Sequence, residues 1–283
     1  MNAIKTILFP TDFSNESLQS LKAAVKFSKI SKSKLIVLNV VDTPFNFNME
    51  NEPIELDLIL QDLISFSKSK LEAISAEIRE EFNFAIETLT YIGETTQSIT
   101  RAVVSYNSDL VIMGTKVTKD LFFKSNSFNI VKNTSIPLLS FSNNNNNIKF
   151  DTILFPFNEL FMTLKKADEV LQIAKLFKSR LVLLGISVVN TLEQRQIITN
   201  NLIFLKSFFE KNKIESEVHF KQNSNYSRAI LEYCDENKID LITIANNLTT
   251  YLKENIASAF AKDVINHSEI PVLTIPVRNG MVR

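Results

Sequence analysis

The chain has 283 residues, 45% of them hydrophobic, which is enough for about two domains with full apolar cores. Its 31 basic residues balance 31 acidic ones, so no net field attracts nucleic acid or an anionic membrane, and we expect neither as a partner. Cys234 is the only cysteine, so no internal disulfide can form, and no apolar stretch approaches the roughly 18 residues of a membrane span. We therefore expect a cytoplasmic protein.

The first half of the chain predicts strands that alternate with helices. Residues 4–9 form an apolar run that stops at Pro10, typical of a buried strand, and Ser14 is placed to cap the following helix. Further strands are predicted at residues 34–41, 84–91, 110–113 and 137–141, and helices at residues 54–82 and 95–107. The longer helix has one predicted core-facing side, made of Leu60, Leu63, Ser67, Leu71, Ile74 and Ile78.

The second half repeats this order. The ILFP sequence of residues 7–10 recurs at residues 153–156, and DLV at residues 109–111 is answered by DLI at residues 240–242. Matching strands are predicted near Phe150, Leu181, Ser216, Leu241 and Val272. Two copies of a domain-sized unit place the function within each copy or between them.

Apolar strands that alternate with helices predict a five-stranded parallel sheet with helices on both faces in each copy, an α/β fold. Consecutive asparagines at residues 143–147 mark the boundary between the copies, because Asn favours turns over strands and helices. We predict a first domain at residues 1–141, an Asn-rich linker at residues 142–148 and a second domain at residues 149–283.

Ligands of such sheets bind beyond the carboxyl ends of the strands, where the strand order reverses. In the first copy these ends are residues 10–14, residues 39–42 and the loop that begins at Gly114. At these positions the chain resembles a universal stress protein in its tandem form, over nearly all of both copies. The motifs that carry the resemblance are KTILFPTDFS at residues 5–14, LNVVD at 38–42, DLVIMGTK at 109–116 and KDLFFKSNSFNIVKNTSIPLL at 119–139.

The resemblance implies an adenine-nucleotide hydrolase-like fold, and we expect the strand order 3-2-1-4-5 in each copy. It also implies that the copies pair through their last strands, residues 137–141 and 271–275, as a pseudo-dimer within one chain. Further association of two chains into a homodimer is left open.

In nucleotide-binding members of that family, an aspartate after the first strand and a valine ending the second hold adenosine. A loop of the form G-x-x-G, nine residues, then G-S/T holds the phosphates. The matching candidate residues are Pro10, Thr11, Asp12, Val40, Gly114 and Ser125. The second glycine is missing and Lys124 replaces the third, and a lysine cannot reproduce a nest of backbone N–H donors. We therefore expect no tightly bound cofactor, and only weak binding of ATP or AMP.

The second copy departs further from the family pattern. Asn158 replaces the aspartate, Ile186 replaces the valine, and the loop from Ala245 contains no glycine. Ser258–Ala259 stands where the resemblance calls for glycine and serine. We expect no nucleotide in this copy.

Some candidate residues also have structural explanations. Asp12 can orient the turn and cap the first helix, without any ligand. Lys116, Lys119 and Lys124 suit a solvated surface at least as well as an anion site.

The remaining reactive side chains suggest no chemistry. Cys234 is expected to be a buried structural thiol. His219 and His267 lie far apart in the sequence and have no cysteine partner, so we expect no metal site. No Ser/His/Asp set and no acidic pair is visible, so we expect no catalytic residues and no enzyme activity.

Three functions remain. The first is a non-catalytic stress-response or regulatory module, working through an unknown protein partner or small ligand. The second is an ATP- or AMP-binding stress protein that uses the first copy alone, with slow hydrolysis. The third is a binder of an apolar ligand, suggested by the 22 Phe residues and by the segment at residues 44–53. The damaged phosphate loop favours the first.

Overall fold

The computed structural model describes residues 4–42, 53–115, 130, 134–142, 148–157, 164–187, 191–247 and 254–277. The first half contains β1 (Thr6–Thr11), α1 (Asn15–Ser31), β2 (Lys34–Val41), α2 (Pro53–Phe82), β3 (Glu87–Ile92), α3 (Thr95–Ser105), β4 (Leu110–Thr115) and β5 (Leu138–Ser142). The second half contains β6 (Thr152–Phe157), α5 (Leu164–Phe177), β7 (Arg180–Ser187), α6 (Leu192–Lys211), β8 (Ser216–Gln222), α7 (Tyr226–Glu236), β9 (Leu241–Asn247), α8 (Glu254–His267) and β10 (Val272–Val277).

Polar side chains set the starts of several helices. Ser14 caps α1, as predicted, because its hydroxyl accepts a hydrogen bond from the backbone N–H of Ser17 at 3.2 Å. Glu94, Thr191 and Asn225 accept backbone N–H groups in the same way at the starts of α3, α6 and α7. Each cap satisfies N–H groups that have no partner within the helix.

The strands form one ten-stranded sheet in the order β3-β2-β1-β4-β5-β10-β9-β6-β7-β8. Within each half the neighbours are parallel and the order is 3-2-1-4-5, as predicted. The predicted pairing of the last strands is confirmed: β5 and β10 run antiparallel, with Leu139 opposite Leu273. The pairing joins the two five-stranded halves into a single sheet. This pairing satisfies two edges that would otherwise be exposed.

The seam between β5 and β10 is not symmetric. The Ser140 hydroxyl donates to the carbonyl of Val272 at 3.3 Å, and the Ser142 hydroxyl donates to that of Glu269 at 2.6 Å. Thr274 takes the place of Ser140 in the repeat, yet its buried Oγ1 has no hydrogen-bond partner in the part of the chain that the structure describes.

One hydrophobic core runs across the seam. The face covered by α1, α2, α5 and α6 holds a single cluster that draws residues from both halves. At its centre the Phe27 and Phe177 rings lie 5.4 Å apart, those of Phe150 and Phe177 4.7 Å apart, and those of Phe141 and Phe150 6.5 Å apart. The opposite face has two separate clusters, one under α3 and one under α7 and α8. The two halves are therefore packed as one body on one face of the sheet.

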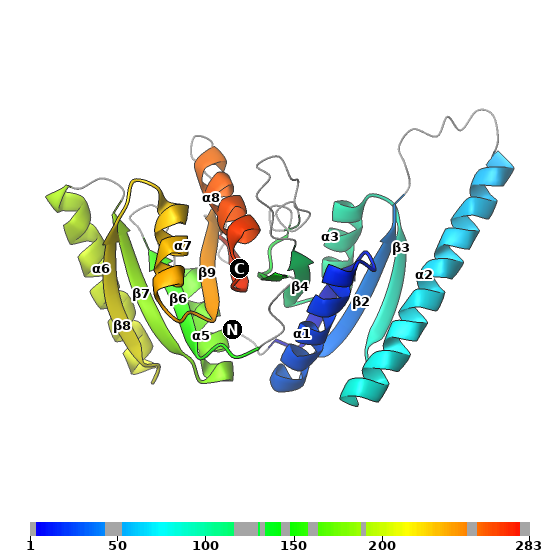
Figure 1. Cartoon of the computed structure of the whole chain (residues 1–283), viewed down its shortest axis with the longest axis horizontal. Helices are drawn as coiled ribbons and strands as arrows, with labels where there is room; N and C mark the ends of the chain where they lie inside the picture. The colour runs from blue at the N-terminus through cyan, green and yellow to red at the C-terminus, as the bar shows by residue number, and fades with distance from the viewer. Residues whose placement is uncertain are drawn as a thin grey trace.

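The antiparallel seam would be expected to point the strands of the two halves in opposite directions. The twist of the sheet offsets this, because roughly 20–25° per neighbouring pair accumulates to roughly half a turn between β2 and β7. Accordingly, α2 and α6, which follow β2 and β7, start on the same side of the molecule (Figure 1). The carboxyl ends of the outer strands in both halves face that side.

Helix α2 departs from the predicted pattern. Ser67, Leu71, Ile74 and Ile78 are buried as predicted, but Leu63 is exposed, so the prediction was wrong at that position. The reason is that the neighbouring Ile64, which is half-buried, takes the core-facing position in that turn, between the half-buried Leu60 and the buried Ser67. The first turns of α2 extend past the strand ends (Figure 1).

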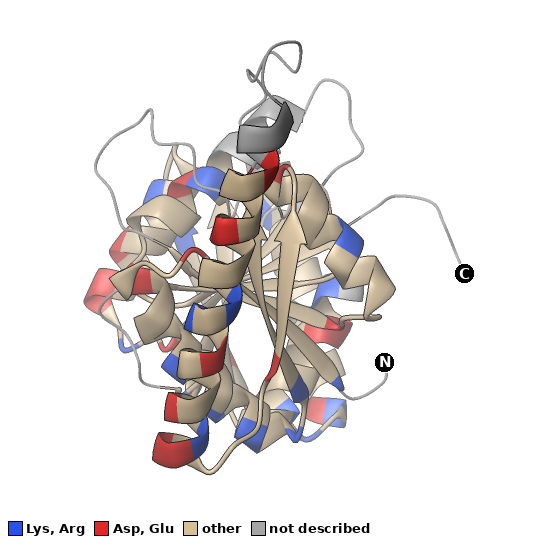
Figure 2. Cartoon of the chain, turned by 90° about the vertical axis from the view of Figure 1, so that its right-hand side faces the viewer, with Lys and Arg blue, Asp and Glu red and all other residues tan. Residues whose placement is uncertain are grey.

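The surface charge is mixed in sign. On the side that presents α2 and the edge strand β3, basic and acidic residues are interspersed rather than gathered by sign (Figure 2). Among the described helices, none is long and apolar enough to cross a membrane.

Candidate functional site

The turn after β1 is organised by its own side chains. Pro10 and Thr11 end β1, and Thr11 pairs with Asn39 of β2. The buried Thr11 hydroxyl accepts hydrogen bonds from the backbone N–H of Phe13 at 3.1 Å and from the Ser17 hydroxyl at 2.9 Å. The end of β1 is thereby tied to the first turn of α1.

Asp12 is exposed and orients the helix cap. Its Oδ1 accepts the backbone N–H of Ser14 at 3.0 Å and the Ser14 hydroxyl at 2.6 Å. Oδ2 has no hydrogen-bond partner among the described residues, so it can still accept one from a ligand. The next residue, Phe13, has a φ of 62°, which is unusual for a bulky side chain and strains the turn.

Sequence reasoning missed a buried polar network behind Asp12. The Asn39 amide donates to the carbonyl of Thr11 at 2.8 Å, and its oxygen accepts the Ser67 hydroxyl of α2 at 2.8 Å. Ser67 and Thr90 of β3 also exchange a hydrogen bond at 2.9 Å. Asn39 therefore ties α2 and three strands to one another, and an amide inside the apolar run of β2 was the signal for it.

Val40 and Gly114 lie at the strand ends but serve the packing. Val40 is half-buried against the cluster under α3, on the opposite face from Asn39. A Cβ at Gly114 would lie 2.7 Å from Oγ of Ser20 and 3.1 Å from the carbonyl oxygen of Glu16, so glycine is required there for α1 to approach β4. Ser125, Lys116, Lys119 and Lys124 lie outside the described residues.

The strand ends of the second half are filled with apolar groups. Gly185 takes the place of Asn39, and a Cβ there would lie 2.6 Å from Leu202 and 2.7 Å from Ile198 of α6. Phe157 and Phe220 stand where the first half has Thr11 and Thr90. Ile186 is buried, as is Ala245; Asn158 lies outside the described residues, and the structure describes no side chains for Ser258–Ala259 in α8. No counterpart of the Asn39 network exists among these residues.

A buried lysine marks the second half. Lys166 of α5 stands at the repeat position of Ser20, and its Nζ donates to the carbonyl of Pro156 at 2.8 Å. The same Nζ lies 4.0 Å from the ring centroid of Phe155. Burial lowers the pKa of Lys166 to about 7. Alignment of the two copies could have indicated the burial of Lys166, because Ser20 at the matching position is buried too.

The structure brings together one Ser, Asp and His, in an order that does not suit catalysis. Ser227 at the start of α7 donates to the carboxylate of Asp263 in α8, and His267 Nδ1 lies 3.0 Å from that carboxylate. The carboxylate stands between hydroxyl and imidazole, so in this arrangement His267 is not placed to take the proton of Ser227.

The other reactive groups are occupied or buried. Burial raises the pKa of the Cys234 thiol to about 12, so it is not a reactive thiolate. His219 Nδ1 meets the Tyr233 hydroxyl at 3.0 Å, far from the strand ends that carry Asp12. No group of three metal-ligating side chains occurs in the described part of the chain.

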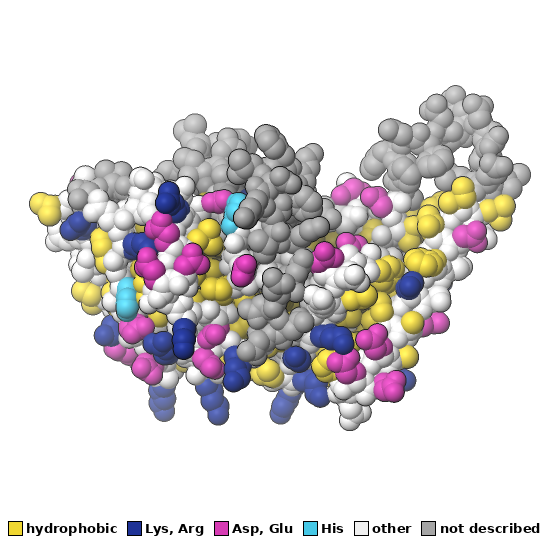
Figure 3. All heavy atoms as spheres, viewed as in Figure 1, with side chains coloured by type: hydrophobic (Ala, Val, Ile, Leu, Met, Phe, Trp, Pro, Cys, Tyr) yellow, Lys and Arg dark blue, Asp and Glu magenta, His cyan; other side chains and the backbone are white. Residues whose placement is uncertain are grey.

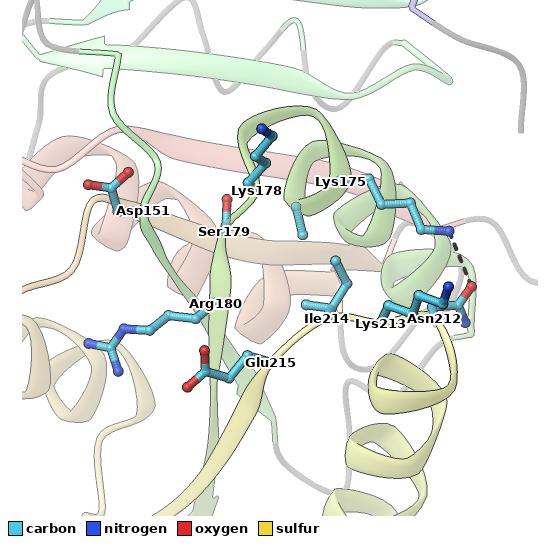
Figure 4. A pocket seen from close by; sticks show the side chains of 10 residues that line it. Asp151, Lys175, Lys178, Ser179, Arg180, Asn212, Lys213, Ile214 and Glu215 are labelled. Carbon is cyan, nitrogen blue, oxygen red and sulfur yellow. Dashed lines mark hydrogen bonds between the residues drawn. The ribbon is translucent and has the colours of Figure 1, made fainter.

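A cavity of about 550 Å³ lies at the opposite ends of the strands, between the last turns of α5 and α6 (Figure 4). Its basic side chains include Lys175, which donates to Asn212 at 3.3 Å, together with Lys178 and Lys213. Two helix carboxyl termini meet here, and their partial negative charge accounts for lysines at these positions. We therefore keep the candidate site at the carboxyl end of β1.

Comparisons with known proteins match both the sequence and the fold. The sequence model of the universal stress protein family matches residues 3–141. A universal stress protein of Methanocaldococcus jannaschii is 26% identical over 152 residues, covering 48% of this chain and 93% of the relative. A universal stress protein from Archaeoglobus fulgidus has the same fold at a TM-score of 0.71 and 19% identity, covering 96% of each chain. A functionally unknown protein from Pseudomonas aeruginosa follows at 0.64 and 15%, covering 97% of this chain and 93% of its own.

Proposed function

The chain belongs to the universal stress protein family, and on that premise we propose that it is a non-catalytic stress-response module whose first half alone keeps a ligand position. The observation that carries the proposal is the contrast between the strand ends. Among the described residues, Oδ2 of Asp12 has no hydrogen-bond partner in the first half. At the strand ends of the second half, Phe157 and Phe220 replace Thr11 and Thr90, and α6 packs closely over Gly185. The module would act in the cytoplasm on a protein partner, with a weakly bound small ligand as its signal.

The absence of catalysis is part of this proposal. The Ser227, Asp263 and His267 arrangement is wrongly ordered for a nucleophile, and the raised pKa of Cys234 makes its thiol unreactive. We expect phosphate release from ATP by the full chain to equal that of buffer. Turnover that survives extensive purification and is lost in Asp12→Ala would contradict the proposal.

The alternative is an ATP- or AMP-binding protein that uses the first half. The Asp12 oxygen favours it, while the use of Gly114 for helix packing weighs against a phosphate cradle there. Without a full set of N–H donors, ATP should gain little over adenosine and bind no tighter than roughly 100 μM, about −5.5 kcal/mol.

Calorimetry on the native chain and on two Asp12 variants separates these readings. Asp12→Asn retains a side-chain oxygen for Ser14 but removes the charge, whereas Asp12→Ala removes the cap contact as well. Adenosine binding that weakens in both variants assigns Asp12 to the ligand. Micromolar ATP binding that disappears in both would favour the alternative over the module.

A further inference from the structure

The two halves differ in the length of the helix that follows their second strand. Helix α2 has 30 residues and α6 has 20. Their buried faces align, with Ser67, Leu71, Ile74 and Ile78 matching Ile198, Leu202, Leu205 and Phe209. With the two helices aligned in this way, eight of the ten additional residues of α2 lie at its start and two at its end.

The part of α2 near and beyond the strand ends carries large apolar side chains in the open. Ile59 is 50% exposed, Leu63 43% and Phe66 56%, and the three recur at helical spacing along one stripe. Hydrophobic side chains are visible along this part of the helix in Figure 3. The stripe spans eight residues, Ile59 to Phe66, about 10 Å of helix.

The direction of this stripe is fixed by salt bridges lower on the same side of α2. Glu77 and Glu81 continue the stripe at helical spacing and reach Lys22 of α1 at 3.8 and 2.7 Å. The stripe therefore faces α1 and the turn that precedes it. Phe13 of that turn meets Phe66 edge-on, with ring centroids 6.5 Å apart at 87°.

The apolar stripe adjoins the polar part of the candidate site. Ser67, the neighbour of Phe66, donates to Asn39, which in turn holds the carbonyl of Thr11. Asp12 and Phe13 follow Thr11 directly. An open carboxylate oxygen and an open apolar surface thus lie on either side of Phe13.

We propose that Phe13, Ile59, Leu63 and Phe66, the α2 wall, bind the apolar, ring-bearing part of a small molecule whose hydroxyl groups are held by Asp12. The proposal rests on the ligand position proposed above and adds the chemistry of the ligand. In the second half the wall is reduced: Ile197, which is 42% exposed, and Gln194 stand where the first half has Phe66 and Leu63, and α6 starts too late to extend further. Asn158, which replaces Asp12, lies outside the described residues. The ligand is thus amphipathic, with a hydroxyl-bearing head and an apolar body.

Substituted nucleosides test the wall directly. Adenosine is compared by calorimetry with adenosine carrying a benzyl group on N6 and with adenosine carrying a benzoyl group on the 5′ oxygen. At least one of the two additions should raise the affinity about tenfold by burying its ring against the wall. Phe66→Ser or Leu63→Ser should remove that gain, so that the substituted nucleosides bind no better than adenosine does to the same variant, while Ile197→Ser on α6 should leave the gain as it is.

The outcomes separate the wall from the ligand position. Equal affinities for all three nucleosides, a gain that survives in both wall variants, or no measurable binding of any of the three would overturn the wall. Loss of binding of all three nucleosides in Asp12→Asn, together with a wall-dependent gain, supports both proposals. Concentration-dependent self-association that vanishes in Phe66→Ser would assign the wall to a second copy of the chain, and so would overturn a ligand there.

Discussion

The first half holds its strand ends together with hydrogen bonds, and the second half does so with apolar packing. Asn39, Ser67 and Thr90 in the first half become Gly185, Ile198 and Phe220 in the second. The changes are concerted, because an amide left without its hydroxyl partners would be costly, whereas replacing a whole network by apolar groups can be nearly neutral. The duplicated fold has thus kept its sheet and changed the side chains at the carboxyl ends of its strands.

The largest expected effect is a loss of stability that tests whether the two halves fold as one unit. Phe150→Ala removes a ring that contacts Phe141 and Phe177 in the shared core, and should lower the free energy of unfolding by about 3–5 kcal/mol. Urea denaturation should still show one transition for the whole chain. The exposed Phe204 offers a control, since Phe204→Ala should change stability by no more than about 0.5 kcal/mol. Two separate transitions would mean that the halves fold independently.

Cutting the chain at Asn145 tests the same seam. The halves should re-associate or precipitate, because each would expose a strand edge and part of the shared core. Size-exclusion chromatography of the two purified halves, separately and mixed, measures this. Two well-behaved monomers would contradict a common core.

The next largest expected effect is on the pH dependence of stability, and it arises from Lys166 in the second half. Burial holds the pKa of Lys166 at about 7 against 10.5, so between those values the unfolded chain binds more protons than the folded one. The contribution of Lys166 therefore makes stability rise with pH across this window, by up to about 1.4 kcal/mol per pH unit. Lys166→Met should flatten that slope and stabilise the protein by about 2 kcal/mol near pH 7.

Urea denaturation at pH 7, 8 and 9 measures both effects of Lys166→Met. The exposed Lys175 serves as the control, because Lys175→Met should leave the slope as it is. An unchanged slope in Lys166→Met would show that Lys166 stays charged in the folded chain.

A smaller effect should follow from making the first half resemble the second. Asn39→Gly leaves the Thr11 carbonyl and the Ser67 hydroxyl with fewer partners, and should cost about 1–2 kcal/mol. Adding Ser67→Ile recreates the pair found at Gly185 and Ile198, and should recover part of the loss. Thermal unfolding of the single and double variants measures the coupling. Additive losses would indicate that the apolar pair of the second half cannot replace the hydrogen-bonded pair of the first half.

The smallest expected effect is a gain in stability that should be equal in both halves. Lys32 and Lys178 end α1 and α5 with the same left-handed φ of 56°, a conformation that glycine adopts without strain. Lys32→Gly and Lys178→Gly should each stabilise the protein by about 1 kcal/mol, and the corresponding alanine variants should not. Unequal gains would show that the helix ends of the two halves differ in strain despite their matching geometry.

Much of the fold could be predicted because it depends on patterns along the chain. Apolar runs located the strands, the repeat gave the same order twice, and the family resemblance implied the pairing of the last strands. The details of the site depend on contacts between distant residues, which a single sequence does not show. Sequence analysis placed Gly114 in a phosphate loop, which stays a prediction, and did not show that Ser20 approaches it too closely for a Cβ.

Sequence analysis missed the roles of two buried polar residues for the same reason. Asn39 and Lys166 are polar residues within apolar surroundings, and sequence patterns alone treat such residues as exceptions. Their partners are the Thr11 and Pro156 carbonyls, each supplied by a strand end that only the folded sheet brings near. The exposed Leu63 was assigned to the core because Leu63 and Ile64 both fit the helical spacing, and only the structure shows that Ile64 is the more buried of the two.

The asymmetric seam between β5 and β10 bears on how the two copies can diverge in sequence. In a dimer of identical chains every substitution appears on both sides of the two-fold axis, so a change that suits one side alone is made at the other as well. Here the Ser140 hydroxyl bonds from β5 to β10, while that of Thr274, its counterpart, has no partner in the described part of the chain. Because the two copies are fused in one chain, a position in one copy can change while the matching position in the other stays as it is. One copy can thus carry Gly185 where the other carries Asn39, a difference that a dimer of identical chains cannot acquire.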